Sequence, residues 1–368
     1  MIRLALIGLG KMGLSHLAMF RPHPDVEVVA ICDTVSYVLD TLSKYTGVKT
    51  YTDYRAMLAE ERLDAVVVST PSKTHAEVVQ AALDRGLHVF CEKPFSLDPA
   101  DGIRLAELAE RKGLVTQVGY HYRFVGAFQE VKRLLDGGAI GKVHHVRVEA
   151  YGPVVLRTKT ATWRTAKSEG GGCLYDYACH ALDLLNYVVG VPSSVGGSVL
   201  NRIFSSDVED EVYSTLYFSN GMTAQLAANW SDESHRKMST KITLWGTEGR
   251  IYADRQEVQV YRRDTPLAAF GLEKGWTIKY TTELTDEVWF YLRGDEYSAQ
   301  VDHFVQHVQQ QNPATRCSFR DAVRTDAVVQ MIVKDANRLP LRTDSGAVKA
   351  EGMQPNDSNS WWKKIIGA

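Results

Sequence analysis

The 368-residue sequence has few cysteines, little net charge and no long apolar run, and each shortage excludes a class of protein. The five cysteines form no CxxC pair and no zinc-binding spacing with histidine, so we expect free thiols and no metal site. A formal net charge of −2 excludes a sequence-wide attraction to nucleic acid. No apolar segment approaches the roughly 20 residues that cross a bilayer, and Ile2–Ile7 is too short for a secretory signal. We expect a cytoplasmic globular protein without nucleic-acid or membrane partners.

The pattern of apolar residues changes along the chain and divides it into two parts. Residues 1–122 alternate short apolar runs with helical patterns, which is typical of parallel βαβ units. From Val143 onward, apolar and polar residues alternate, and Asn220-Gly221 marks a hairpin. We predict an α/β Rossmann domain at 1–122, a doubly wound parallel sheet. It is followed by an α+β domain at 123–342 with a large, open, mostly antiparallel sheet, whose last helix (319–336) packs back on the first domain, and by a tail at 343–368.

A glycine motif stands between the first predicted strand and the first predicted helix. It reads Gly8-Leu9-Gly10-Lys11-Met12-Gly13, the GxGxxG pattern. The first glycine permits a tight turn, the second lets the backbone approach a pyrophosphate, and the third lets helix and strand pack closely. The apolar stripe of the following helix is expected to consist of Met12, Leu14, Leu17, Ala18 and Phe20. The N-terminus of this helix would bind the pyrophosphate of a dinucleotide.

An acidic residue ends the second predicted strand. Asp33 stands twenty residues after Gly13, where a carboxylate accepts hydrogen bonds from the adenosine ribose. The same carboxylate would repel a 2′-phosphate, and the next base is Lys44. We therefore predict NAD as the cofactor and disfavour NADP.

Two further segments follow predicted strands of the first domain and face the crevice where ligands of such sheets bind. Glu92-Lys93-Pro94 follows the fifth strand, and Lys93 suits a hydrogen bond to a substrate hydroxyl, although a lone lysine is more often simply solvated. Thr70-Pro71 follows the fourth strand, where Pro71 fixes the chain beside the cofactor. His75 either lines the site or belongs to the first turn of the next helix.

The segment from Gly170 to Asp183 combines three glycines with an acid and a histidine. Asp176 and His180 are four residues apart and share one face of a helix. Histidine is the natural base for the proton of an alcohol whose hydride departs, and a neighbouring carboxylate can stabilise the imidazolium. An isolated pair at this spacing is also typical of a surface contact. Asp183 either supports His180 or faces solvent.

These segments together resemble the Gfo/Idh/MocA oxidoreductases, the glucose–fructose oxidoreductase and inositol dehydrogenase family, from Met1 to about Ala336. The resemblance implies a Rossmann domain, a second domain whose open sheet makes homodimer or homotetramer contacts, and Lys93, Asp176 and His180 as catalytic residues. It rests on Gly8–Gly13, Thr70-Pro71 with His75, Glu92-Lys93-Pro94, Gly119-Tyr120 with Arg123-Phe124, and Gly170–Asp183.

Five residues are candidates for the wall of the substrate pocket. Many family members have a different polar residue where this sequence has His121-Tyr122 before Arg123. The identity of the substrate therefore cannot be taken from any one member of the family. Trp163 is as consistent with stacking on a sugar ring as with a purely structural role. The candidates are Tyr120, Tyr122, Arg123, Trp163 and Arg164.

The sequence leads to one main functional hypothesis and two alternatives. The main hypothesis is an NAD-dependent dehydrogenase acting on a secondary alcohol of a sugar, nucleotide sugar or cyclitol such as inositol. The first alternative is a glycosidase-type enzyme that oxidises and re-reduces its substrate with retained NAD. The second is a non-catalytic sugar- or NAD-sensing co-repressor, which would not need Lys93, Asp176 and His180 together.

Overall fold

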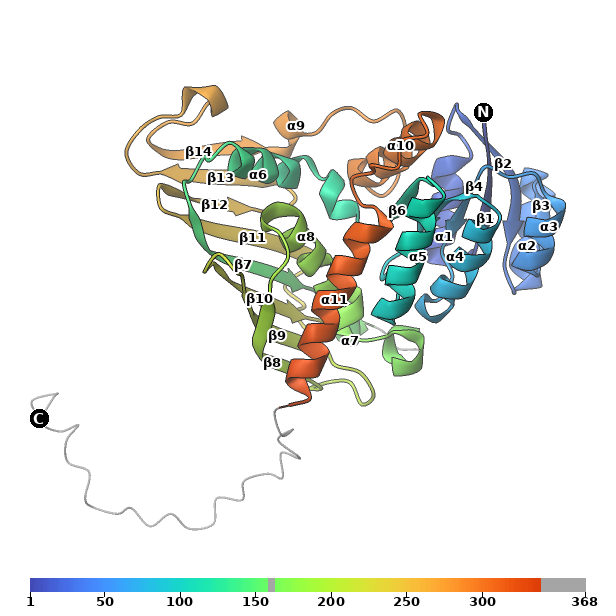
Figure 1. Cartoon of the computed structure of the whole chain (residues 1–368), viewed down its shortest axis with the longest axis horizontal. Helices are drawn as coiled ribbons and strands as arrows, with labels where there is room; N and C mark the ends of the chain where they lie inside the picture. Colours follow the sequence, from blue (N-terminus) through green and yellow to red (C-terminus); the bar gives the residue numbers. More distant parts are fainter. Residues whose placement is uncertain (158–162, 339–368) are drawn as a thin grey trace, which may run out of the picture. The chain divides into compact units, whose positions relative to one another are not determined.

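The computed structural model describes residues 1–157 and 163–338 (Figure 1). Met1–Ala336 form one compact unit. The tail predicted at 343–368 lies outside the described residues. Within the described residues, no helix is long and apolar enough to cross a membrane.

The first part of the chain forms a six-stranded parallel sheet in the order β3-β2-β1-β4-β5-β6, which confirms the predicted Rossmann fold. The direction of winding reverses between β1 and β4, so ligands are expected at the carboxyl ends of these strands. The strands are β1 (Ile2–Ile7), β2 (Val26–Cys32), β3 (Lys49–Tyr51), β4 (Ala65–Val68), β5 (His88–Cys91) and β6 (Thr116–Val118). The helices are α1 (Lys11–Phe20), α2 (Ser36–Thr46), α3 (Tyr54–Glu60), α4 (His75–Asp84) and α5 (Pro99–Arg111).

Helix α1 buries only part of its predicted apolar stripe, because Leu17 and Phe20 are buried but two other members are not. Leu14 is 41% exposed and Ala18 is also exposed, whereas His16 is fully buried beside Leu17. The reason is the contact between Gly13 and Gly8, which brings α1 so close to β1 that the face carrying Gly13 must turn inward. A polar residue therefore lies in the interface between α1 and the sheet.

The second part of the chain forms an eight-stranded sheet in the order β14-β13-β12-β11-β7-β10-β9-β8. All neighbours are antiparallel except β7 and β10, so the predicted mostly antiparallel sheet is confirmed. Strand β8 continues through two glycines by means of a bulge at Gly196-Gly197. The strands are β7 (Val143–Tyr151), β8 (Ser194–Asn201), β9 (Glu211–Tyr217), β10 (Thr223–Asn229), β11 (Ser239–Gly246), β12 (Gly249–Ala253), β13 (Glu257–Arg262) and β14 (Gly275–Tyr280), of which β14 was not predicted.

One face of the eight-stranded sheet is covered by helices (Figure 1). These are α6 (Gly126–Asp136), α8 (Cys179–Val189) and α11 (Phe319–Ala336). Helix α11 also contacts α5 of the parallel part, while α10 (Asp295–Gln309) contacts α1 and β1. Shorter helical segments are η1 (Ser72–Thr74), η2 (His121–Phe124), α7 (Val154–Arg157), η3 (Trp163–Thr165), η4 (Lys167–Glu169), η5 (Leu174–Ala178), η6 (Ala268–Phe270) and α9 (Thr281–Leu284).

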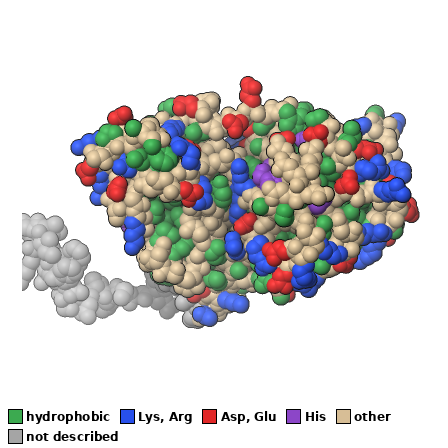
Figure 2. Space-filling model, turned by 45° about the horizontal axis from the view of Figure 1, so that its top comes forward, with side chains coloured by type: hydrophobic (Ala, Val, Ile, Leu, Met, Phe, Trp, Pro, Cys, Tyr) green, Lys and Arg blue, Asp and Glu red, His purple; other side chains and the backbone are tan. Residues whose placement is uncertain are grey.

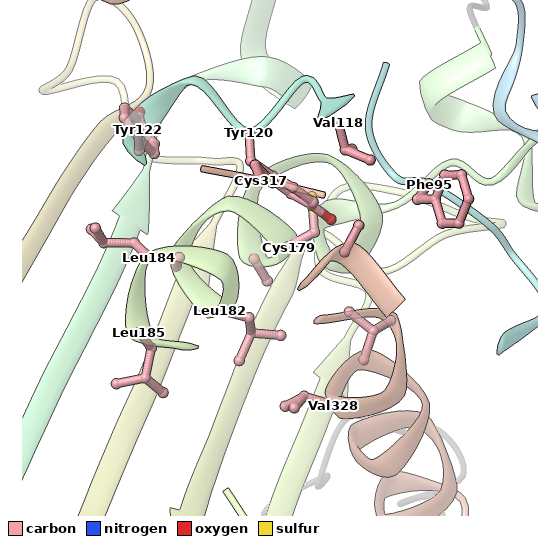
Figure 3. Close-up of a cluster of buried hydrophobic side chains, with 14 of the residues drawn as sticks. Phe95, Val118, Tyr120, Tyr122, Cys179, Leu182, Leu184, Leu185, Cys317 and Val328 are labelled. Carbon is pink, nitrogen blue, oxygen red and sulfur yellow. The ribbon is translucent and has the colours of Figure 1, made fainter. Parts of the chain in front are cut away.

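The core beneath the helical layer is continuous from one sheet to the other. Figure 3 shows Tyr120 beside Cys179 and Cys317, with Tyr122 set apart from them above Leu184 of α8. Tyr120 and Cys179 are fully buried, and Val328 of α11 closes the same cluster. All five cysteines are free and buried, which confirms that none of them forms a disulfide.

Candidate active site

The glycine motif sits at the switch point of the parallel sheet, and two of its glycines are required by the packing of the chain itself. Gly8 has a φ of +92°, and a Cβ there would lie 2.7 Å from the backbone of Ser69 and Thr70. A Cβ on Gly13 would overlap the carbonyl of Gly8. Both positions therefore fix the close approach of β1, α1 and the loop after β4.

Gly10 is different, because the described part of the chain does not require a glycine there. Its φ is −64°, and a Cβ would meet no described atom within 4 Å. Gly10 is the N-cap of α1 and has no side-chain cap bond, so the first N–H groups of the helix are available to a ligand. This open space at a helix N-terminus, beside exposed Lys11 and half-buried Met12, fits the pyrophosphate of a dinucleotide.

Asp33 lies against this loop at the end of β2. Its Oδ2 accepts a hydrogen bond from the Leu9 N–H at 2.5 Å, and its Oδ1 accepts one from the Val35 N–H at 2.9 Å. The carboxylate is half-buried and is followed by exposed Thr34, Val35 and Ser36. The residues present thus fit an adenosine ribose with free hydroxyls.

Replacing Asp33 by alanine is expected to raise the Kd for NAD roughly tenfold, or about 1.4 kcal/mol, and the Kd for NADP much less. The reason is that the ribose hydroxyls of NAD lose an acceptor, whereas a 2′-phosphate also loses a repulsive charge. Titration of both dinucleotides by intrinsic fluorescence measures the ratio. Asp53→Ala is the control, because Asp53 caps α3 through the Arg55 N–H. An equal loss for both cofactors would contradict the assignment.

A buried cluster of charges joins the end of β5 to the segment before α8. Lys93 Nζ donates to the backbone oxygen of Asp176 at 2.8 Å and to its Oδ1 at 3.0 Å. Arg164 Nε donates to the other carboxylate oxygen, Oδ2, at 2.8 Å. Burial opposes the charged form of Lys93, but Asp176 raises its pKa above the usual value. Burial likewise opposes ionisation of Asp176, yet Lys93 and Arg164 hold its pKa below the usual value. Both groups are therefore charged at neutral pH.

The three glycines explain how Arg164 reaches Asp176. A Cβ on Gly171 would overlap the backbone oxygen of Arg164, and the Gly172 N–H donates to that oxygen at 3.0 Å. A Cβ on Gly172, with φ of +113°, would overlap the carboxylate of Glu209. The same carboxylate accepts the Leu174 N–H at the start of η5. The glycines thus let η3 and Glu209 close on the segment that carries Asp176.

His180 lies on α8 in a buried pocket of rings. Its ring centroid is 4.9 Å from that of His121, 5.7 Å from Tyr120 and 5.4 Å from Tyr122. Burial lowers its pKa well below 6.5, and the charges of Lys93 and His121 act in the same direction. At neutral pH the imidazole is therefore the uncharged, basic form.

Two buried polar atoms in this pocket have no partner within the described ranges. They are Nδ1 of His180 and the hydroxyl oxygen of Tyr120. Unpartnered buried polar atoms are rare in native structures and commonly mark functional positions. The charge of Lys93 acts on His180, so this pocket adjoins the Lys93–Asp176–Arg164 cluster.

The loop after β4 is fixed to the loop after β5 by His75. Nδ1 of His75 lies 2.9 Å from the Pro94 oxygen, and Nε2 lies 3.0 Å from the Thr70 oxygen. Burial lowers its pKa, an effect that the two carbonyls oppose. His75 therefore positions the carbonyl groups of Thr70 and Pro94, while Pro71 itself is exposed.

Arg123 and Asp183 are bonded to each other rather than to the other candidate residues. Arg123 donates from Nε and Nη2 to both oxygens of Asp183, at 2.8 and 2.7 Å, and both side chains are buried. Asp183 also accepts from Thr325 of α11. Asp183 therefore neither supports His180 nor faces solvent, and Arg123 fixes η2 to α8.

The remaining candidates for the pocket wall differ in burial: two tyrosines are buried, and Trp163 is half-buried. Tyr120 and Tyr122 are almost fully buried under His180, and Tyr122 also packs on Phe128. Trp163 is half-buried and carries the Arg164 guanidinium over its ring at 4.9 Å. On the face in Figure 2, histidine and basic side chains gather near the middle of the view.

Sequence reasoning overlooked two histidines. His121 stacks on Tyr297 of α10 with ring centroids 4.6 Å apart, and burial lowers its pKa to about 3. His16 of α1 forms a 2.7 Å hydrogen bond to Glu92. The sequence signal for His16 was its place directly before Leu17, on the side of the helix that was expected to be buried.

Among the described residues, no cluster of three or more histidine, cysteine or acidic side chains is placed to hold a metal ion.

Comparison with known proteins identifies the class. Residues 2–120 match the oxidoreductase family with an NAD-binding Rossmann fold, and residues 128–252 match the GFO/IDH/MocA C-terminal domain. The chain belongs to the Gfo/Idh/MocA oxidoreductase family, and its cofactor is NAD.

Its relatives include proteins of known activity. Myo-inositol 2-dehydrogenase of Thermotoga maritima is 29% identical over 267 residues, 69% of this chain and 75% of that protein. GenD2 from gentamicin A biosynthesis, solved in complex with NAD, is 26% identical with a TM-score of 0.74 and covers 91% of this chain and 94% of its own. Levoglucosan dehydrogenase in complex with NADH and levoglucosan shares the fold, with a TM-score of 0.78, 24% identity, and coverage of 92% and 97%.

Proposed function

We propose that this protein is a dehydrogenase that oxidises a secondary alcohol of a sugar, nucleotide sugar or cyclitol with NAD. The observation that carries the proposal is the buried carboxylate of Asp176, bound by Lys93 and by half-buried Arg164, beside an uncharged His180. The nicotinamide ring, when bound, accepts the hydride. The residues of the chain bind and orient the alcohol and remove its proton.

In this proposal, His180 is the general base. An alcohol carbon releases hydride more readily as its hydroxyl loses a proton, so a base near the hydroxyl lowers the barrier. The buried imidazole is uncharged at neutral pH and can therefore take that proton.

Lys93 has a complementary role at the same oxygen. Its ammonium is charged and is held by Asp176, so it can donate to the substrate hydroxyl and stabilise the negative charge that develops there. Asp176 has both oxygens engaged, one by Lys93 and one by Arg164. A substrate hydroxyl that binds Asp176 would share these oxygens with the two cations.

The class of substrate follows from the polar lining and from the relatives. Charged and hydrogen-bonding groups suit a ligand with several hydroxyls, and half-buried Trp163 offers a ring face for a sugar. The relatives named above act on or bind an inositol and an anhydrosugar. The basic residues Arg164 and Lys167, close to Trp163 in the sequence, suit the diphosphate of a nucleotide sugar. Lys159 of the same segment lies outside the described residues.

The assay that tests the proposal follows NADH absorbance with NAD and a panel of inositols, aldoses and UDP-sugars. We expect NADH to accumulate with members of one substrate class and not with the others. NAD binding without NADH formation across the panel would contradict a net dehydrogenase. That result would favour retained NAD, as in a glycosidase, or a sensor.

The uncovered face of the eight-stranded sheet is the proposed contact in a homodimer or homotetramer. Side chains of this face alternate with buried ones along β9 and β13. Large apolar side chains are exposed at two places in this sheet, on β9 and on β13 with β14, and exposed apolar groups of this kind are typical of a protein interface. These side chains are Tyr213, Tyr217, Tyr261, Trp276, Ile278 and Tyr280.

A further inference from the structure

A buried histidine–carboxylate pair lies beside the proposed catalytic cluster and has no part in the roles described so far. Nε2 of His16 lies 2.7 Å from Oε1 of Glu92, and His16 is completely buried against Phe90. Because a carboxylate only accepts, His16 is the donor. Nδ1 of His16 is buried and has no partner in the described parts of the chain.

The surroundings hold the Glu92 carboxylate in one place. Its Oε2 accepts the Lys93 N–H at 3.2 Å, and a Cβ on Gly119 would lie 2.9 Å from both carboxylate oxygens. Burial opposes its charge, but the bond from His16 and the charge of Lys93 keep its pKa below the usual value. Glu92 is thus an ionised, immobilised carboxylate at the carboxyl end of β5.

The topology places this carboxylate on the nicotinamide side of the cofactor site. Asp33 ends β2, on one side of the Gly8–Gly13 loop, and β4 and β5 lie on the other side. A dinucleotide with its adenosine ribose at Asp33 and its pyrophosphate at α1 therefore extends toward β5. The ammonium of Lys93 is bonded to Asp176, whereas the side-chain partner of Glu92 is His16, so Glu92 is a separate, fixed carboxylate at this end.

We propose that Glu92, positioned by His16, makes the protein bind NAD+ more tightly than NADH by placing a fixed negative charge beside the nicotinamide ring. The ring is cationic only in the oxidised cofactor, so the carboxylate stabilises one redox form and leaves the other almost unaffected. This role rests on the cofactor orientation of the proposed function, but not on the identity of the substrate.

The test measures the Kd of NAD+ and of NADH separately, by calorimetry on the full chain without substrate. Glu92→Gln keeps the shape and removes the charge, and we expect the ratio of the NADH Kd to the NAD+ Kd to fall roughly tenfold. That change raises the two-electron potential of the bound cofactor by about 30 mV. His16→Leu should lower the same ratio by removing the donor, whereas His16→Gln, whose amide can donate to Glu92, should restore most of it.

A second histidine–carboxylate pair, just beyond the C-terminal end of α1, provides matched controls. His23 follows α1, and its Nε2 lies 3.3 Å from Oδ1 of Asp302. His23→Gln and Asp302→Asn should leave the ratio unchanged. Equal weakening of both cofactors in Glu92→Gln, or an unchanged ratio, would overturn the proposal and assign the pair a structural role. Because only binding is measured, a protein inactive on every sugar would contradict the proposed function without affecting this result.

Discussion

Replacing His180 with glutamine is expected to lower kcat roughly a thousandfold, while the Kd for NAD changes less than about threefold. Glutamine fills much of the same volume and can hydrogen-bond the substrate, but it cannot take a proton. Stopped-flow or steady-state NADH absorbance gives kcat, and fluorescence titration gives the Kd. His303→Gln is the control, since His303 on α10 packs against Phe124 rather than in the proposed site.

The pH profile gives a second test of His180. Since burial depresses its pKa below 6.5, the imidazole remains unprotonated as the pH falls to 6.5. Activity should therefore be lost on the acid side only below that pH, and the His180→Gln variant should lack this acid limb. An acid limb at or above pH 6.5 that persists in the variant would assign the base elsewhere.

Lys93→Met is expected to lower kcat/KM about a thousandfold, with the KM for substrate raised and the NAD Kd nearly constant. The change removes the ammonium that donates to the substrate oxygen and keeps most of the apolar stem. It also leaves Asp176 with Arg164 as its remaining cation, so the pKa of Asp176 should rise toward its usual value.

The control for Lys93 is another lysine whose ammonium binds a carboxylate. Lys279 on β14 is bonded to Glu130 at 2.8 Å, away from the proposed site. Lys279→Met should change thermal stability without changing kcat/KM. If Lys93→Met keeps normal turnover and an unchanged melting temperature, the proposed role of Lys93 is wrong.

The fold was largely predictable because its signals are local. Buried parallel strands are near-continuous apolar runs, and the motif from Gly8 to Gly13 lies between the first strand and helix as predicted. The hairpin at Asn220-Gly221 also forms, with the Gly221 N–H bonded to the Phe218 oxygen. Strand β14 was missed although it is as long as β13: none of its six residues is buried, so it lacks the buried apolar face that marks β13.

Contacts between distant segments were not predictable from the sequence. The bond between Arg123 and Asp183 joins residues 60 positions apart, and nothing in either neighbourhood distinguishes it from a pocket residue or a solvated acid. The bond between His16 and Glu92 spans 76 positions and depends on which face of α1 turns inward. The close contact between Gly13 and Gly8 determines which face of α1 is buried. The positions of the apolar residues alone do not predict this.

The position of α11 has a consequence for how the chain can be divided. Phe319 of α11 stacks on Phe95 with ring centroids 4.1 Å apart, and Asp326 accepts the Ser96 N–H at 3.1 Å. A fragment cut at residue 122 would lose these contacts and expose Phe95, at a cost of about 1.5–3 kcal/mol for that side chain alone. Helix α11 thus completes the core of the nucleotide-binding half. The Phe319 N–H also donates to Thr116, so the folding of this half depends on a segment that is synthesised about 200 residues later.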